Sequence, residues 1–479
     1  MKMIKAITLI FVILIISIAV SGCTMLERNI DDMKAPEYQT LSINKNHNED
    51  QDDNHSSTTK ITSNETTTQV INETDPGETT SDNATINISN ETKPPKTTKP
   101  PKSENTQTTT KNQNDDKTNP TTDVPSTLPA KDSIPISSRK ELEYIGNNTA
   151  YPLNEKYHLT NNIDLGDKEW IPINGFTGIF DGQNYNIKNL FVLSTSNNTH
   201  AGLFGTVVSE SKKTVIIKNL SVHVNSKGVT AVFNHESTLT HFSIVAAGGL
   251  IGACYSNNAN SEILIENCYA TGDIFSIATE AIYFPTFSYA GGLIGQVATG
   301  GGSIIIKRAY ATGNIYASSD KDSAAAGGLV GGLEAWQNDG PIIIENCYAT
   351  GNVTSSVSYS AKFRKIDSSA GGLVGRSDDI YCQSKMTIRN SYTTGEVAAQ
   401  SVCDSSAGGI IGFKNNLTTV DSCYYLSDNL ITDGLINHSG TSLSKTKMKM
   451  NSSFEKWDFS KIWFIEEGKS YPKLLIYIS

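Results

Sequence analysis

Short apolar runs bounded by glycine dominate the pattern of hydrophobic and polar positions after about residue 136. These runs are rich in β-branched residues, and no helical apolar period is sustained over about 11 residues or more. The pattern therefore predicts β-strands. One segment differs, because Ser138 stands before a short amphipathic stretch and predicts a capped helix over residues 138–145.

Two sequence elements recur along this part of the chain. The first reads Ala-Gly-Gly, then two aliphatic residues and a further Gly, at 247–252, 290–295, 326–331, 370–375 and 407–412. The second reads Ile-Glu-Asn-Cys-Tyr-Ala-Thr-Gly or a variant of it, at 265–272, 306–313, 344–351 and 388–395, with a truncated copy at 420–424. Residues 187–190 and 217–220 share the frame of the second element, which predicts about seven aligned turns.

A single repeat is too small to bury its own apolar face, so neighbouring repeats must stack. Short parallel strands stacked about 4.8 Å apart produce columns of like residues. The predicted fold class is therefore all-β: a single-stranded parallel β-helix, right-handed by the general crossover preference. Glycine suits its tight corners, and the recurring asparagine predicts a ladder of side-chain amides at one corner.

The two elements in this order resemble the GLUG-motif repeat family of prokaryotic surface proteins. The segments 157–165, 170–173 and 176–182 and the closing segment 457–474 match what accompanies such repeats. The resemblance implies a β-helical extracellular protein, often grouped with adhesins, and it carries no established catalytic residue. Arg308 and Ala309 replace the usual asparagine and cysteine, which makes an unbroken ladder doubtful.

The ends of a solenoid must be covered, because they expose unpaired strand edges. We expect an N-terminal cap at 134–180, repeats at 181–439 and a C-terminal cap at 440–479. Trp457, Phe459, Trp463 and Tyr471 fit a plug better than a ligand platform.

The N-terminus is typical of an exported lipoprotein. Lys2 and Lys5 precede an apolar stretch over residues 6–20, which is short for a membrane span. The sequence Val-Ser-Gly-Cys at 20–23 resembles a lipobox, which implies cleavage of the signal peptide 1–22 and lipidation of Cys23. The alternatives are an ordinary signal peptide or an uncleaved anchor. We expect an exported chain held at the outer face of a membrane by its N-terminal lipid.

Residues 23–133 are rich in Thr, Asn, Ser and Pro, and they predict a disordered stalk because they lack apolar surface. Candidate N-glycosylation acceptors are Asn54, Asn64, Asn72, Asn83, Asn87, Asn90, Asn197 and Asn352. Chance is the competing explanation, since Asn- and Thr-rich text generates such sequons.

The formal net charge is −10, which argues against nucleic acid as a partner. Cys268, Cys347 and Cys423 fall on alternate turns, about 10 Å apart, so we expect free, buried thiols. Cys382 and Cys403 are a candidate disulfide pair within one repeat.

The sequence contains no complete motif for catalysis, for a cofactor or for a metal. His235-Glu236 and His241 have the wrong spacing for a zinc helix, and Gly468-Lys469-Ser470 lacks the upstream glycine of a phosphate loop. Asp181 fits a turn, while Asp320, Asp322, Asp378 and Asp379 are expected in loops and are candidates for weak calcium binding. On one outer face, acids should alternate with cations in cross-strand pairs: Glu266, Glu345 and Asp421 with Lys188, Lys218, Lys307 and Arg389.

The favoured function is a non-enzymatic adhesin or binding module that recognises glycans, matrix or surface proteins of other cells. A β-helical polysaccharide lyase or glycoside hydrolase and a structural envelope protein stay open as alternatives. An enzyme would require three or more acids converging on one face. Recognition is expected in the variable loops at 226–246, 275–289, 317–324, 354–369 and 376–385.

Overall fold

A computed structural model describes residues 132–195, 200–210, 212–234, 243–279, 286–335, 340–358, 367–378, 384–426 and 429–475. The predicted signal peptide, Cys23, the stalk with its six sequons, Asn197 and Cys382 lie outside the described residues. Within these ranges, no helix combines the length and the apolar character that crossing a bilayer requires.

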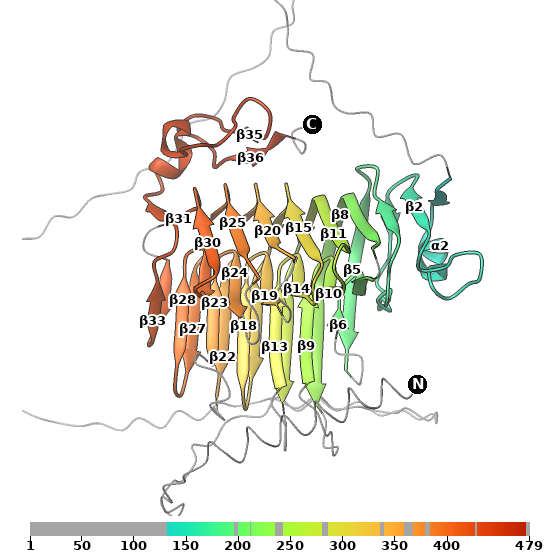
Figure 1. The fold of residues 1–479 in the computed structure, drawn as a ribbon, viewed down its shortest axis with the longest axis horizontal. Coiled ribbons are helices and arrows are strands. Elements are labelled where there is room, and N and C mark those ends of the chain that lie inside the picture. The colour runs from blue at the N-terminus through green and yellow to red at the C-terminus, as the bar shows by residue number, and fades with distance from the viewer. Residues whose placement is uncertain are drawn as a thin grey trace, which may run out of the picture. The chain divides into compact units, whose positions relative to one another are not determined.

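Parallel strands wind around one axis in successive coils, and equivalent strands of each coil stack into sheets (Figure 1). Two of these sheets are short and continuous. Sheet B contains β7 (Phe204–Ser209), β10 (Ile251–Ser256), β14 (Ile294–Thr299), β19 (Val330–Ala335), β24 (Val374–Asp378) and β29 (Ile411–Phe413). Sheet C contains β6 (His200–Ala201), β9 (Ser243–Gly248), β13 (Thr286–Gly291), β18 (Ser323–Gly327), β23 (Ser368–Gly371), β28 (Ser405–Gly408) and β33 (Leu435–Asn437).

Sheet A is the largest and consists of three rows. Its first row is β1 (Ile134–Ile136), β2 (Lys156–Leu159), β4 (Ile179–Asp181), β8 (Thr214–Asn234), β11 (Glu262–Thr271), β15 (Ser303–Lys307), β20 (Ile342–Glu345), β25 (Met386–Arg389) and β30 (Thr418–Asp421). The second row is β3 (Ile163–Asp164), β5 (Asn186–Ser194), the later parts of β8 and β11, β16 (Tyr310–Thr312), β21 (Tyr348–Ala349), β26 (Tyr392–Thr393), β31 (Tyr424–Leu426) and β34 (Thr441–Leu443). The third row is the ends of β5 and β8, then β12 (Ile274–Thr279), β17 (Ile315–Ser319), β22 (Val353–Val357), β27 (Val397–Ser401) and β32 (Leu430–Thr432).

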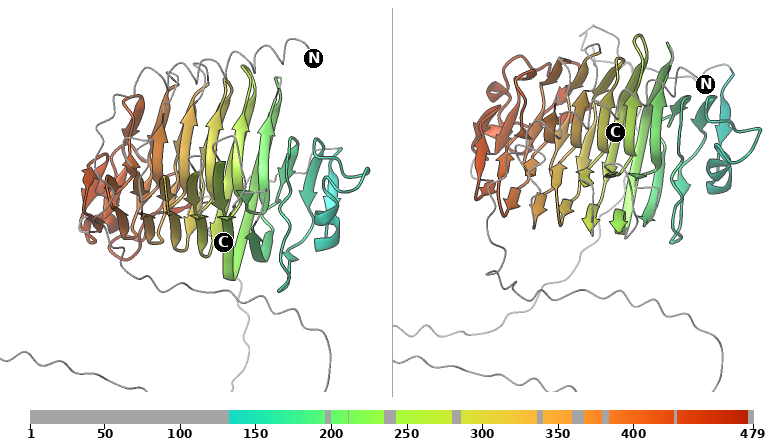
Figure 2. Two further views of the ribbon diagram at one scale, coloured as in Figure 1. Left: turned by 90° about the horizontal axis from the view of Figure 1, so that it is seen from below. Right: turned by 60° about the horizontal axis from the view of Figure 1, so that its bottom comes forward.

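Seven coils stack in the described part of the chain, six of them passing through all three sheets and coil 7 through sheets A and C, which confirms the predicted parallel β-helix. Coil 1 runs from β4 to β7, coil 2 from β8 to β10, coil 3 from β11 to β14, coil 4 from β15 to β19, coil 5 from β20 to β24, coil 6 from β25 to β29 and coil 7 from β30 to β33. Figure 2 shows this stacking from two further sides. The right-handed sense of the coil stays a prediction.

The Ala-Gly-Gly element holds adjacent coils close together at the junction of sheets C and B. Ala290 pairs with Ala247 on one side and with Ala326 on the other. A Cβ placed on Gly328 would overlap the carbonyl oxygen of Gly372 in the next coil. Glycine is therefore required there for the approach of two backbones, as the sequence predicted.

The predicted asparagine corner is a column of residues in the left-handed region of backbone conformation. All six have φ between 49° and 54°: Asn219, Asn267, Arg308, Asn346, Asn390 and Ser422. Asparagine tolerates this region better than most residues. Arg308 adopts it as well, so the repeat geometry overrides the local preference of that residue.

The predicted alignment of residues 187–190 with 217–220 is wrong. Ile187 pairs with Val222, and it is Phe180 of β4 that pairs with Ile217. The Ile-Lys-Asn-Leu sequence thus occurs one strand later in coil 1 than in coil 2. Sequence similarity alone cannot distinguish two neighbouring strands that share the same alternation of buried and exposed residues.

The N-terminal end of the solenoid is covered by a helix and an aromatic cluster. Helix α2 (Arg139–Tyr144) begins at Ser138, whose hydroxyl accepts a hydrogen bond from the backbone N–H of Glu141, so the predicted cap is confirmed. Below it, Tyr157, Phe176, Phe180 and Phe204 are buried and pack ring against ring.

The C-terminal segment does not plug the end of the solenoid. Residues 444–475, called the C-terminal cover below, include the 3-10 turns η1 (Lys447–Lys449) and η2 (Asn451–Ser453) and the antiparallel pair β35 (Trp463–Phe464) and β36 (Lys473–Leu474). The C-terminal cover folds back over the outer face of sheet A (Figure 1). Tyr425, buried in coil 7 against Gly409, fills the interior instead.

Candidate binding surfaces

Five aliphatic side chains form a straight row on the outer face of sheet A. Adjacent members pair in register from coil 1 to coil 5: Ile179, Ile216, Leu264, Ile305 and Ile343. Each is partly exposed, while the residues on either side of it along the strand from coil 2 onward point into the core. At about 4.8 Å per coil, the row is about 19 Å long. Thr387 continues it in coil 6.

The row follows from uninterrupted aliphatic triplets such as 263–265, 304–306 and 342–344. Successive side chains of a strand point to opposite faces, so the middle residue of each triplet must point outward. The aliphatic triplets carry this signal, although the repeated motifs do not show it.

A ladder of charges runs beside the aliphatic row, two residues further along each strand. Oppositely charged side chains of neighbouring coils pair: Lys218 Nζ lies 3.0 Å from Asp181 Oδ2, and Lys307 Nζ 3.4 Å from Glu266 Oε1. Arg389 pairs with Glu345 at 2.5 Å. The predicted alternation is therefore confirmed, except that Asp181 takes the coil 1 position that was assigned to Lys188.

The asparagine ladder begins at Asp181, which also makes the predicted turn by accepting a hydrogen bond from the N–H of Gln183. Asn219 Nδ2 donates to Asp181 Oδ1 at 3.0 Å, and Asn267 Nδ2 donates to Asn219 Oδ1 at 3.0 Å. Arg308 Nε then donates to Asn267 Oδ1 at 2.8 Å. A guanidinium has no acceptor, so the ladder cannot pass beyond Arg308.

Past the asparagine corner, the outer face of sheet A carries a column of stacked tyrosines. Tyr269, Tyr310, Tyr348 and Tyr392 stack with ring centroids 4.5, 4.6 and 5.1 Å apart. The column extends to His223 in coil 2, whose ring meets Tyr269 edge-on.

The C-terminal cover lies over the C-terminal part of this tyrosine column, at Tyr348 and Tyr392. Tyr392 Oη donates to the Pro472 carbonyl at 2.7 Å, and Trp457 Nε1 donates to the Ser422 carbonyl at 2.9 Å. Trp463 is fully buried against Tyr348 and Tyr392. The aromatic residues of the closing segment thus pack onto the side of the coils, and they leave Tyr269 partly exposed.

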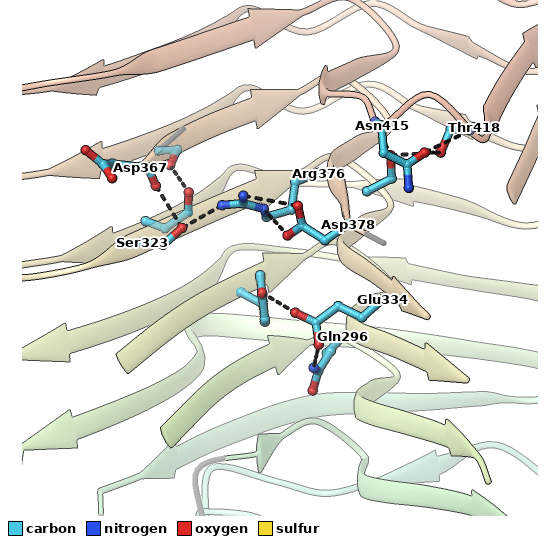
Figure 3. A network of polar contacts seen from close by, with 12 residues as sticks. Gln296, Ser323, Glu334, Asp367, Arg376, Asp378, Asn415 and Thr418 are labelled. Atoms are coloured by element: carbon cyan, nitrogen blue, oxygen red, sulfur yellow. Dashed lines mark hydrogen bonds and ion pairs between the residues drawn. The ribbon is translucent and has the colours of Figure 1, made fainter. Parts of the chain in front are cut away.

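The outer faces of sheets B and C face each other across the Ala-Gly-Gly corner and bury a second apolar cluster around Tyr289. Figure 3 shows the polar network beside it. Tyr289 Oη donates to Glu334 Oε1 at 2.5 Å, and Gln296 Nε2 donates to Glu334 Oε2 at 2.9 Å. Tyr255 Oη donates to Gln296 Oε1 at 2.9 Å and lies 3.2 Å from His200 Nε2. Burial lowers the pKa of His200 to about 4.

Arg376 links the same two sheets one coil further along. It is 1% exposed, its Nε lies 2.7 Å from Asp378 Oδ2, and its Nη1 donates to Ser323 Oγ at 2.6 Å (Figure 3). The expected loop position of Asp378 is wrong, because this residue lies in β24 and its carboxylate faces the guanidinium of Arg376. The buried carboxylates of Glu334 and Asp378 have partners within the protein, which suits a structural brace between the sheets.

Asp320 and Asp322, which were also considered for calcium, lie at the turn between β17 and β18. Asp322 Oδ2 accepts a hydrogen bond from the N–H of Thr286 at 2.8 Å, and burial raises the pKa of the Asp322 carboxyl. Asp379 lies outside the described residues. In the ranges that the structure describes, no three His, Cys, Asp or Glu side chains are grouped as they would be to hold a metal ion.

The predicted cysteine column is seen at alternate coils. Cys268, Cys347 and Cys423 are buried free thiols in coils 3, 5 and 7, as expected. Burial raises the pKa of each thiol to about 12, so all three stay protonated at neutral pH. Cys403 is exposed, and its pairing with Cys382 stays a prediction.

The predicted recognition loops are shorter than expected. Most of 226–234, 275–279, 286–289 and 354–357 belongs to paired strands, and the intervening residues lie outside the described part. Asn352 is exposed, and its Oδ1 accepts a hydrogen bond from the N–H of Glu396 at 3.0 Å. Its glycosylation stays a prediction.

Comparison with known proteins bears on the repeat. The family model described as "The GLUG motif" matches residues 322–354, which supports the resemblance over that segment. No curated protein matches the chain. A crystal structure titled as a "putative immunoglobulin A1 protease from Bacteroides ovatus" is similar at 20% identity with a TM-score of 0.47, covering 72% of this chain and 92% of that chain. That likeness is too distant to transfer an activity.

Proposed function

We propose that this GLUG-motif solenoid is the head of an exported, lipid-anchored surface protein that acts as a non-enzymatic adhesin. The observation that carries the proposal is the aliphatic row of sheet A. Five partly exposed Ile and Leu side chains in register form a flat apolar strip beside the charge ladder on the outer face of sheet A. Contiguous apolar surface rimmed by polar residues is typical of protein interaction sites.

The chemistry of the row favours a protein ligand over a glycan. Aliphatic side chains offer no hydrogen-bonding group to the hydroxyls of a sugar. They do match an apolar strip on another protein, and the charge ladder beside them would set its orientation. We therefore narrow the ligand class to a protein of the matrix or of another cell.

The pairing of the ionisable groups supports binding rather than catalysis. On the outer face of sheet A, the carboxylates of Asp181, Glu266 and Glu345 each pair with a Lys or Arg of the next coil. A glycoside hydrolase needs two carboxylates placed across a substrate, one of them available as an acid. Carboxylates that pair with cations are poorly suited to that role.

Export and anchoring rest on the N-terminal sequence. The positive residues, the short apolar stretch and the Val-Ser-Gly-Cys motif support lipidation of Cys23. The Pro- and Thr-rich stalk would then extend the head away from the membrane surface.

The proposal is tested by presenting the full chain to three kinds of probe: immobilised matrix proteins, a glycan array and whole cells of other species. We expect saturable binding to a protein probe or to cells, and binding to cells that is lost when their surface proteins are removed by protease. Binding to glycans alone would contradict the protein ligand. Failure with all three probes, or turnover of a polysaccharide by the chain, would contradict the adhesin.

A further inference from the structure

The two ends of the solenoid are closed to different degrees. At the N-terminal end, β1 pairs with β2, helix α2 packs on the core, and sheet B is extended by bridges from Ile173 and Phe176 to β7. Trp170 is buried there and donates its indole N–H to the Leu203 carbonyl at 2.9 Å. That end is therefore covered by the chain's own N-terminal cap.

At the C-terminal end of the residues that the structure describes, only one row of sheet A is continued beyond coil 7, where β34 pairs with β31. In the described part of the chain, β29, β32 and β33 are the last strands of their stacks, and Figure 1 shows β33 at the opposite end from α2. Three large apolar side chains are exposed on these strands: Ile431 (53%), Leu435 (60%) and Ile436 (46%).

The open face of coil 7 is the surface that each earlier coil buries against its successor. Leu435 pairs in register with Ser406, and Ile436 pairs with Ala407. One coil earlier, Ser406 is 3% exposed and Ala407 is fully buried. The last coil thus places larger apolar residues at positions that are buried elsewhere, next to strand edges with unpaired backbone groups. Such an edge favours pairing with another strand.

We propose that coil 7 is a self-association surface and that two copies of this chain join tail to tail through β33 and β32. The interface would continue the contact that already holds the coils together. The N-terminal end of a second copy cannot serve, because its own cap covers it, which excludes an open head-to-tail polymer. The C-terminal cover cannot serve either, because it is held on sheet A by Tyr392 and Ser422.

An open end that meets its own copy gives a closed two-fold dimer. Across a two-fold axis perpendicular to sheet C, the two β33 edges would run antiparallel and exchange backbone hydrogen bonds. Leu435 and Ile436 of both copies would then be buried. Two heads joined in this way would double the number of binding rows on one assembly.

The test is cysteine crosslinking of the detergent-solubilised full chain, in a parent with Cys382→Ser and Cys403→Ser. Leu435→Cys places a thiol at the proposed interface. Ile171→Cys is the matched control, because Ile171 is 80% exposed but lies on the N-terminal cap. Under mild oxidation we expect a reducible covalent dimer from Leu435→Cys and only background from Ile171→Cys. Equal dimer yields from the two variants would overturn the proposal.

A second measurement covers a crosslink that fails for reasons of geometry. Sedimentation of the same full chain at about 10 μM should give the mass of a dimer, which Leu435→Lys converts to a monomer and Ile171→Lys leaves unchanged. A monomeric native chain, or a Leu435→Lys chain that stays dimeric, contradicts tail-to-tail association. Proteolysis of the variants checks that the coils remain folded.

Discussion

Removing the guanidinium that braces sheets B and C should destabilise the solenoid far more than removing an exposed one. Arg376 is 1% exposed, lies 2.7 Å from Asp378 and donates to Ser323 in sheet C, and its guanidinium lies over Phe413. In Arg376→Met the Asp378 carboxylate stays buried without its cation. Breaking a buried pair from one side costs about 3–5 kcal/mol.

The matched control is Arg389→Met in β25, the next strand along the chain. Like Arg376, Arg389 pairs with a carboxylate, in this case Glu345 of the previous coil, but the side chain of Arg389 is 47% exposed. An exposed pair contributes about 0–1 kcal/mol. The double variant Arg376→Met with Asp378→Met should recover most of the loss, because no buried charge is then left alone.

Hydrogen exchange is the suitable assay, since a repeat protein opens locally rather than in one step. Amides of β19 and β24 should exchange faster by about two to three orders of magnitude in Arg376→Met and by less than tenfold in Arg389→Met, from about 1.4 kcal/mol per decade of equilibrium constant. If the amides exchange at the same rate in the two single variants, or faster in the double variant than in Arg376→Met, the role of Arg376 as a brace between sheets B and C is contradicted.

Three further predictions concern single residues. Tyr392→Phe removes the hydrogen bond to Pro472, so the C-terminal cover should detach more readily, by about 1 kcal/mol, and protease should cut residues 444–475 first; unchanged cutting would argue that the rings alone hold it. Burial depresses the pKa of His200 to about 4, below its ordinary 6.5, so its contribution to the free energy of unfolding is present above pH 6.5 and is lost as the pH falls towards 4. His200→Gln should flatten the dependence of stability on pH in that window, and an equally steep profile would contradict the buried neutral histidine. Cys23→Ala should abolish incorporation of labelled lipid and release the chain from the membrane fraction, whereas a chain that stays anchored would point to an uncleaved signal.

Repetition made the fold predictable. The Ala-Gly-Gly element requires a backbone approach that only glycine allows, as at Gly328, and the asparagine corner requires a left-handed conformation. Both demands recur in coils 2 to 6, so the sequence shows them several times over. The alternate positions of Cys268 and Cys347 followed from the same register.

Features without a repeat were harder to predict. The C-terminal cover packs on the tyrosine column through Trp463, and nothing in an aromatic-rich segment tells whether it covers the end or the side of a solenoid. The network around Glu334 and Arg376 joins two sheets whose outer faces meet only because the cross-section is concave at that corner. Alternation of residues along one strand carries no information about that angle. The aliphatic row, by contrast, could have been predicted from the aliphatic triplets, because the middle residue of each triplet must point outward.

If the aliphatic row of sheet A is the binding surface, polar substitutions within it should weaken binding, whereas a polar substitution outside it should not. Leu264→Gln combined with Ile305→Gln places polar groups in the middle of the row, while Leu193→Gln alters an exposed residue outside it. At about 1 kcal/mol for each partly buried aliphatic side chain, the account predicts a loss of affinity of about 30-fold for the row variant and no change for Leu193→Gln, measured on the protein or cell probe that binds the native chain. Equal affinity of the row variant and the native chain would show that the aliphatic row of sheet A is not the binding surface.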